Sequence, residues 1–175
     1  MKMPEADWVR DQCKARRLDY KKSTAAQKLL QGLKLQPLTD AEIDDKLEES
    51  GNPHALEIER QRLAEKRLTY DDLLRLAELI LANDKVAQLY RDHFGAVIVD
   101  EFQDLTPQQL RIINRIGYGK TTYAGDLAQG IYSFAGARPD KVYQQIQAEC
   151  PKTIEFSESH RSSPAVLAAV NSLNS

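Results

Sequence analysis

The N-terminal part of the chain is polar and thinly apolar, and its few apolar residues fall between helix-capping and helix-ending residues. Ser23 and Thr39 are placed to cap two helices, which Gly32 and Gly51 would end, and Asn52-Pro53 starts a third. No strand pattern interrupts them. We therefore expect a small helical lobe that packs on another part of the protein.

From Leu68 onward the pattern changes to alternating helices and strands. Thr69-x-x-Asp72 is a capping box before a helix with a broad apolar face, and the β-branched run Ala96–Val99 predicts a strand buried on both faces of a parallel sheet. The remaining candidates are a helix from Thr106-Pro107, a strand over Thr121–Ala124, a helix over Asp140–Glu149, a strand over Thr153–Phe156 and a last helix from Ser163-Pro164. The alternation predicts an α/β fold in which 97–99 is the central strand.

Composition narrows the class of protein only slightly. A formal net charge of -2 argues against an overall basic protein that coats nucleic acid, and Cys13 and Cys150 form neither a zinc motif nor a disulfide framework. No apolar run reaches the length of a membrane span, so we expect a cytoplasmic protein that contacts no membrane. A basic cluster either touches a DNA backbone or is a solvated helix face; it comprises Lys14, Arg16, Arg17, Lys21 and Lys22.

The strongest chemical signal follows the apolar run, where Asp100 and Glu101 come directly after Val97–Val99. Ligands bind beyond the carboxyl ends of parallel strands, so this position suits a pair of carboxylates that serves a nucleotide. Asp100 would hold Mg²⁺, with Glu101 beside it, and Glu101 would orient and deprotonate the attacking water. The alternative is that the two acids only complement the dipole of the next helix.

Three further segments occur in order with this pair: residues 99–104 (VDEFQD), 124–137 (AGDLAQGIYSFAGA) and 159–163 (SHRSS). Together they resemble motifs II, III and IV of the superfamily 1 DNA helicases of the UvrD/Rep/PcrA kind. Residues 70–74 (YDDLL) are also similar to a segment upstream of motif II in that family. The resemblance covers the chain from about Leu68 to its end and implies a RecA-like (P-loop NTPase) fold that uses ATP and Mg²⁺.

The resemblance also implies roles for single residues around the nucleotide. Gln129 falls where a motif III glutamine senses the γ-phosphate, and Gln103 falls among the nucleotide-binding positions. Arg161 matches a motif IV arginine that reaches the γ-phosphate, where a guanidinium offsets charge in the transition state. His160 stands where a tyrosine usually stacks on adenine, so nucleotide selectivity follows less directly than the fold.

On the DNA side, Tyr132 and Phe134 match aromatic residues that stack on bases of single-stranded DNA, a contact worth about 1–3 kcal/mol per base. Without the resemblance, both would be interpreted as core residues of a short helix. Gly130 replaces a usual serine and Ala135 a common arginine, which leaves the grip on DNA less defined.

A helicase motor also needs a phosphate-binding (Walker A) loop, G-x-x-x-x-G-K-[ST], between a strand and a helix. Gly119-Lys120-Thr121 looks like its end, but Asn114 occupies the first glycine position and the segment runs from a helix into a strand. We therefore interpret it as a helix-to-strand turn. The family places the loop upstream and a further domain, 2A, downstream, so we expect an interior piece of a longer protein.

The expected organisation is a partial RecA-like parallel sheet with an all-helical N-terminal lobe. Its parts are a 1B-like helical subdomain (1–67), the second half of motor domain 1A (68–162) and the start of a helix toward 2A (163–175). The leading hypothesis is a fragment of an ATP-dependent 3′–5′ DNA helicase or translocase of the type used in DNA repair. It would act on single-stranded DNA or a duplex junction and would be inactive without its missing loop and domain 2A.

Two other functions compete with this one. The first is a binding module for nucleic acid or a partner protein that keeps the helicase fold and has lost hydrolysis. Retention of Asp100, Glu101, Gln129 and Arg161 together disfavours that module, because a binder needs no such set. The second is a different P-loop ATPase, which the motifs around Gln103 and Gln129 disfavour.

Overall fold

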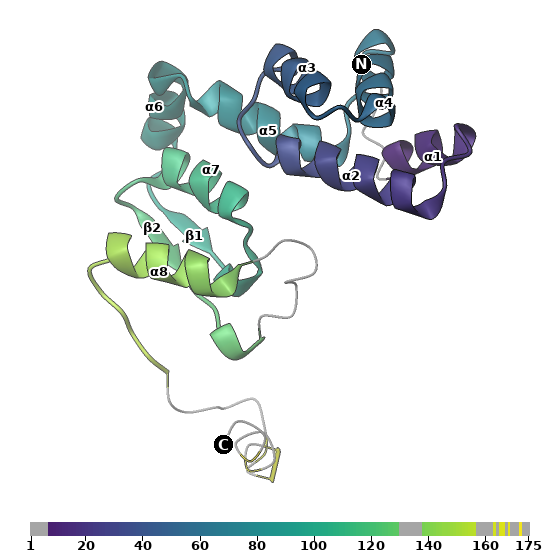
Figure 1. Cartoon of the computed structure of the whole chain (residues 1–175). Helices are drawn as coiled ribbons and strands as arrows, with labels where there is room; N and C mark the ends of the chain where they lie inside the picture. The colour runs from purple at the N-terminus through teal and green to yellow at the C-terminus, as the bar shows by residue number, and fades with distance from the viewer. Residues whose placement is uncertain are drawn as a thin grey trace. The chain divides into compact units, whose positions relative to one another are not determined.

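The computed structural model describes residues 7–129 and 138–156, together with Ser163, Ala165, Val166, Ala168 and Ser172. The chain divides into two compact units, residues 1–143 and residues 144–175. The secondary structure (Figure 1) is mostly helical with one small sheet. In order, the elements are α1 (Trp8–Ala15), α2 (Tyr20–Lys34), α3 (Asp40–Glu49), α4 (Pro53–Ala64), α5 (Tyr70–Leu81), α6 (Asp84–His93), β1 (Val97–Val99), η1 (Phe102–Asp104), α7 (Pro107–Gly117), β2 (Thr121–Tyr123), η2 (Leu127–Gln129) and α8 (Pro139–Glu149).

Residues 7–67 form α1 to α4 and contain no β-strand, as predicted. The capping box of Thr39 and Glu42 is formed, and Asn52 accepts a hydrogen bond from the Ala55 amide at the start of α4. The predicted start of α2 at Ser23 is wrong, because Asp19 caps the helix one turn earlier. Its predicted end at Gly32 is also wrong, and α2 continues to Lys34.

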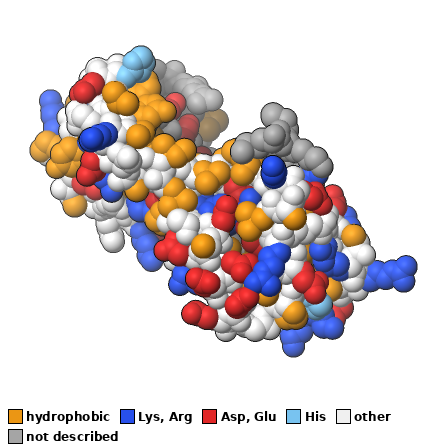
Figure 2. Space-filling model, turned by 90° about the horizontal axis from the view of Figure 1, so that it is seen from above, with side chains coloured by type: hydrophobic (Ala, Val, Ile, Leu, Met, Phe, Trp, Pro, Cys, Tyr) orange, Lys and Arg blue, Asp and Glu red, His pale blue; other side chains and the backbone are white. Residues whose placement is uncertain are grey.

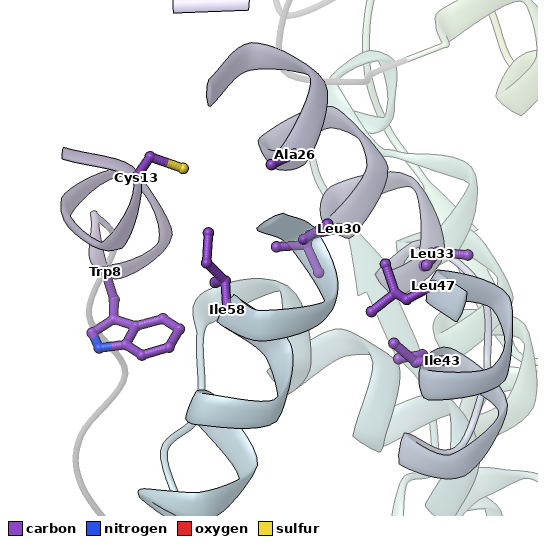
Figure 3. Close-up of a cluster of buried hydrophobic side chains, with 9 residues drawn as sticks. Trp8, Cys13, Ala26, Leu30, Leu33, Ile43, Leu47 and Ile58 are labelled. Atoms are coloured by element: carbon purple, nitrogen blue, oxygen red, sulfur yellow. The ribbon is translucent and has the colours of Figure 1, made fainter. Parts of the chain in front are cut away.

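The helical lobe has a hydrophobic core of its own, despite its polar sequence. The core side chains come from α1, α2, α3 and α4 and meet between these helices (Figure 3). They are Trp8, Cys13, Ala26, Leu30, Leu33, Ile43, Leu47, Ala55 and Ile58. A few well-buried apolar residues per helix therefore suffice, since the four helices bury them against one another.

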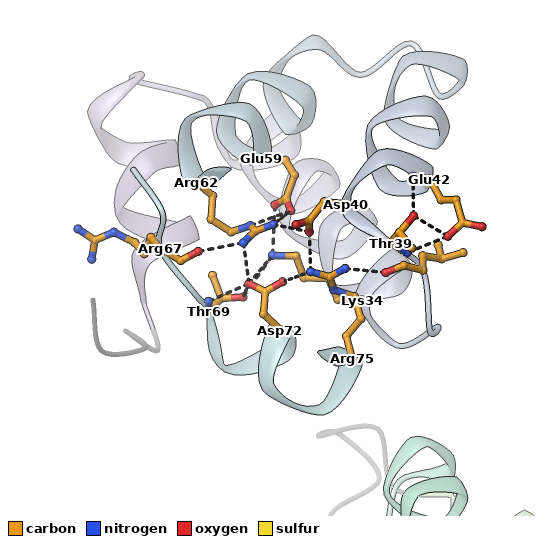
Figure 4. Close-up of polar contacts among 11 residues, drawn as sticks. Lys34, Thr39, Asp40, Glu42, Glu59, Arg62, Arg67, Thr69, Asp72 and Arg75 are labelled. Atoms are coloured by element: carbon orange, nitrogen blue, oxygen red, sulfur yellow. Dashed lines mark hydrogen bonds and ion pairs between the residues drawn. The ribbon is translucent and has the colours of Figure 1, made fainter. Parts of the chain in front are cut away.

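A buried ionic network joins α5 to this lobe (Figure 4). The Lys34 ammonium lies 3.2 Å from the Glu59 carboxylate and 3.1 Å from the Asp72 carboxylate, and all three side chains are almost fully buried. Asp72 also pairs with Arg62 and Arg75, at 3.6 and 3.1 Å. Buried charges are tolerated only when they are paired and hydrogen-bonded, so α2, α4 and α5 are held in one arrangement.

A second polar contact ties α7 to the same lobe. The Gln108 side-chain amide donates hydrogen bonds to the Lys34 backbone carbonyl and to the Glu78 carboxylate, each at 3.0 Å. Arg111 donates to Glu78 at 2.6 Å and to the Leu35 carbonyl at 2.9 Å. The helix that follows the Asp100–Glu101 pair is thus anchored to the C-terminal end of α2.

The sheet consists of β1 and β2, paired in parallel with Val97 opposite Thr121 and Val99 opposite Tyr123. Helices and parallel strands alternate here, as an α/β fold requires. The central position predicted for 97–99 is wrong, because within the described residues β1 has a single strand neighbour. Burial on both faces is wrong too: Val99 is buried, but Ile98 is 78% exposed.

The strand predicted over Thr153–Phe156 is absent, and these residues have no regular secondary structure. A segment becomes a strand only when a neighbouring strand pairs with its backbone. Across the part of the chain that the structure describes, no strand pairs with 153–156. The helix predicted over Asp140–Glu149 is formed as α8. The last helix, from Ser163-Pro164, lies mostly outside the described residues.

Candidate functional site

The candidate site lies at the carboxyl ends of β1 and β2, which meet at one edge because the strands are parallel. The Ala124 amide donates to the Val99 carbonyl at 2.8 Å, and the Phe102 amide donates to the Ala124 carbonyl at 3.0 Å. These two bonds extend the strand pairing past the ends of β1 and β2. The segments that follow each strand are therefore held next to each other.

Asp100 and Glu101 are exposed at this edge, directly after β1. Glu101 has a left-handed backbone, with φ 54° and ψ 48°, which a residue with a Cβ adopts only at a cost of about 1 kcal/mol or more. Its amide donates to the Asp100 carboxylate at 3.0 Å. The sharp turn leaves both residues exposed at the edge of the sheet.

Gln103 is buried beneath this turn, with 2% of its surface exposed. Its side-chain nitrogen donates to the Glu101 carboxylate at 2.5 Å, and its side-chain oxygen accepts from the Asp126 amide at 3.0 Å. Both ends of the amide are therefore used inside the protein. The sequence suggested a nucleotide contact for Gln103 and did not reveal this link.

Gly125 packs directly against Gln103 and Phe102, which leaves no room for a side chain at this position. A Cβ at this position would come within 2.3 Å of the Gln103 side-chain oxygen and 2.9 Å of the Phe102 backbone nitrogen. Phe102 is buried, and its ring stacks on Tyr143 with 5.8 Å between the ring centroids. Only a residue without a side chain fits where the two strand ends approach so closely.

Gln129 lies in η2, in the segment that follows β2. Its backbone amide and its side-chain amide both donate to Asp126, to the carbonyl and to the carboxylate respectively, at 3.0 Å each. The site therefore brings together Asp100, Glu101 and Gln103 with the segment that carries Asp126 and Gln129. The other predicted site residues, Tyr132, Phe134, His160 and Arg161, lie outside the described residues.

The donor set at this edge fits Mg²⁺. Mg²⁺ keeps several water ligands and is usually held by one or two carboxylates together with substrate phosphates. Asp100 and Glu101 supply carboxylates on two consecutive exposed residues. In the described part of the chain no three Asp, Glu, His or Cys side chains gather into a metal cage, so this pair would need phosphate oxygens and water to complete the coordination.

The Gly119-Lys120-Thr121 segment is the turn between α7 and β2. Gly119 has a left-handed backbone with φ 74°. The Lys120 ammonium donates to the backbone carbonyls of Phe94, at 2.9 Å, and of Arg91, and the Thr121 hydroxyl donates to the Gly117 carbonyl at 2.7 Å. The side chains that would serve a phosphate loop are therefore used to cap helix ends.

The basic cluster of the first two helices is partly neutralised by neighbouring side chains. Lys14 pairs with Asp11 and Lys22 with Asp19, while Arg16 donates to side-chain oxygens of Gln12 and Gln61. On the face seen in Figure 2, acidic and basic side chains are interspersed and form no single basic field. The solvated-face interpretation of the cluster is the one these contacts favour.

Neither cysteine takes part in the site. Cys13 is buried in the helical lobe, Cys150 is half-buried, and both are free thiols. Among the described helices, none combines the length and the apolar character needed to cross a lipid bilayer.

Comparison with known proteins identifies relatives for most of this chain. A family model described as the UvrD/REP helicase N-terminal domain matches residues 2–151. The chain is 33% identical over 123 residues to a subunit of the ATP-dependent helicase/nuclease of Syntrophomonas wolfei, and the alignment covers 66% of this chain and 10% of that protein. It is 33% identical over 111 residues to ATP-dependent DNA helicase Rep of Escherichia coli (61% and 16%) and 34% identical over 109 residues to ATP-dependent DNA helicase UvrD2 of Mycobacterium tuberculosis (59% and 15%). The chain thus spans 10–17% of the length of these and similar curated relatives.

Proposed function

Because the chain belongs to the UvrD/REP helicase N-terminal domain family, we propose that its Asp100–Glu101 edge serves ATP hydrolysis in an ATP-dependent DNA helicase or translocase. One observation carries the proposal. The carboxyl ends of two parallel strands hold an exposed carboxylate pair beside a segment that ends in Gln129, and Gln103 bridges the two. A carboxylate pair that only complemented a helix dipole would not need this second segment.

In the proposed reaction, Asp100 holds Mg²⁺, alone or together with Glu101. Mg²⁺, when bound, neutralises charge on the β- and γ-phosphates. Glu101 orients a water molecule and accepts its proton as the water oxygen attacks the γ-phosphorus. The bond from that phosphorus to the bridging oxygen then breaks, which yields ADP and inorganic phosphate. Gln129 contacts the γ-phosphate and reports its loss to the segment that follows.

The phosphate cradle would come from a segment other than Gly119-Lys120-Thr121, since Lys120 is engaged at helix ends. We therefore expect the isolated 175 residues to hydrolyse ATP no faster than background. The family resemblance further supports His160 and Arg161 as nucleotide contacts, Tyr132 and Phe134 as single-stranded DNA contacts, and 3′–5′ movement. It also supports a RecA-like motor half over 68–162, a 1B-like lobe over 1–67 and, from residue 163, a helix toward domain 2A.

The test is an exchange of segments with a relative of known activity. Residues 68–156 replace the matching segment of the Escherichia coli helicase Rep, and ATP hydrolysis is measured with and without single-stranded DNA. We expect hydrolysis in this chimera, and Asp100→Asn to lower it by about 100-fold or more, because the metal loses its carboxylate. Asp140→Asn, a change of the same kind at an exposed carboxylate of α8, is the matched control. An Asp100→Asn chimera as fast as the control would contradict the proposal.

A further inference from the structure

The environment of Gln103 differs from that of a residue that binds a ligand. Its side chain is buried, and the nitrogen and the oxygen of its amide both have partners within the protein: Glu101 at 2.5 Å and the Asp126 amide at 3.0 Å. One donor and one lone pair of the amide remain, but the burial of the side chain keeps them away from a nucleotide. Gln103 therefore acts on the site through its two neighbours.

The two partners of Gln103 belong to different halves of the site. Glu101 follows β1, whereas Asp126 follows β2 and accepts both hydrogen bonds from Gln129. The amide of Gln103 thus connects the carboxylate pair to the Gln129 segment. Gly125 lets the two segments approach closely enough for one side chain to span them.

The backbone of Glu101 shows why such a connection is needed. A left-handed glutamate relaxes to an ordinary conformation unless its surroundings hold it. The Phe102 amide, bonded to the Ala124 carbonyl, fixes the residue after the turn, and Gln103 fixes the side chain of Glu101 itself. Loss of either bond would free the carboxylate to point elsewhere.

We propose that Gln103 is a positioning residue that couples the orientation of the Glu101 carboxylate to the position of the Asp126–Gln129 segment. The catalytic role of this coupling rests on the proposed function. The coupling itself is between the two hydrogen bonds that the Gln103 amide makes, to Glu101 and to Asp126. A movement of Gln129 on loss of a phosphate would then reach Glu101 through Gln103. Water activation and phosphate sensing would change together.

The coupling can be measured on the 175-residue chain without nucleotide, by NMR hydrogen exchange at the Asp126 amide. Gln103→Ala removes the acceptor, so exchange at Asp126 should rise by roughly fivefold to tenfold. Gln103→Glu keeps an acceptor oxygen but loses the donor to Glu101 and faces that carboxylate, so exchange at Asp126 should rise here as well, by less than in Gln103→Ala. Gln88→Ala, at an exposed glutamine that bonds to Asp92, is the matched control, and exchange in α2 reports whether each variant is folded.

A double-mutant cycle separates positioning from simple packing. Glu101→Ala should raise exchange at Asp126 by about twofold or more when Gln103 is present, because the amide then loses the partner that holds it, and should add nothing when Gln103 is alanine. Equal effects of Glu101→Ala in both backgrounds, or an unchanged Asp126 amide in Gln103→Ala, would overturn the coupling. Because no nucleotide is involved, this result is distinct from a failure of hydrolysis in the Rep chimera.

Discussion

Lys120 donates a hydrogen bond from its ammonium group to the backbone carbonyl of Phe94, the C-cap residue of α6, at 2.9 Å. A cation at this position satisfies carbonyls that the helix leaves without intrahelical donors and complements its dipole. The contact crosses from the α7–β2 turn to the end of α6, 26 residues earlier in the sequence. A lysine that resembles a phosphate ligand by its neighbours in sequence is, in space, a helix cap.

The first prediction is that Lys120→Met destabilises the protein and leaves nucleotide binding unchanged. Loss of charged hydrogen bonds at a partly exposed site should cost about 1 kcal/mol of unfolding free energy. Urea unfolding of the chain and ATP binding by the Rep chimera measure the two effects. The control is Lys85→Met, at an exposed lysine in the first turn of α6, the helix whose C-terminal end Lys120 contacts. Abolished nucleotide binding in Lys120→Met alone would identify Gly119-Lys120-Thr121 as a phosphate loop after all.

A second prediction compares two glycines. Gly125→Ala should lower the unfolding free energy by about 1–3 kcal/mol, because the new Cβ would overlap Gln103 and the backbone of Phe102. Gly32→Ala should raise it by up to about 1 kcal/mol, since Gly32 lies inside α2 with open space around it and alanine favours the helix. Thermal or urea unfolding of both variants checks the opposite signs, and a stable Gly125→Ala would contradict the close approach of the strand ends.

A third prediction concerns Asp72 and its neighbour Asp71. Burial opposes ionisation of Asp72, but Lys34, Arg62 and the hydrogen bonds from Thr69 outweigh it and hold the pKa of Asp72 below its ordinary value of 3.8. Asp72→Asn leaves those cations without their carboxylate and should cost about 3–5 kcal/mol at neutral pH. Desolvation instead raises the pKa of Asp71, so Asp71→Asn should cost nothing.

The contribution of Asp72 to the free energy of unfolding should fall as the pH falls. A carboxyl group whose pKa is lower in the folded state stabilises the protein above its unfolded pKa and loses that effect as pH falls through the folded value. The difference between wild type and Asp72→Asn should therefore be constant from neutral pH down to about 4 and shrink below it. Urea unfolding at pH 7 and pH 3 measures the difference, and an equal gap at both would show that Asp72 is not ionised in the folded network.

Capping boxes were readable from the sequence, although Ser23 and Gly32 misplaced both ends of α2, and contacts between distant residues were not readable. The capping boxes at Thr39, Thr69 and Thr106 are formed, because a cap depends on residues only three positions apart. The strand over Thr153–Phe156 is absent, because its formation depends on a partner that composition does not reveal. The bridge made by Gln103 was missed for the same reason: its second partner, Asp126, is near only once β1 and β2 have paired.

Glu101→Gln in the Rep chimera tests whether Glu101 activates water in an ATP-hydrolysing site. Glutamine keeps the shape of the side chain and cannot accept the proton, so hydrolysis should slow by about 100- to 10,000-fold in single turnover. ATP affinity should stay within about threefold, because Asp100 still holds the metal and Glu101 acts mainly in the transition state. Glu155→Gln, at an exposed residue of the exchanged segment 68–156, should change neither the hydrolysis rate nor the ATP affinity. Hydrolysis by Glu101→Gln at the rate of the Glu155→Gln control would show that Glu101 does not activate the attacking water.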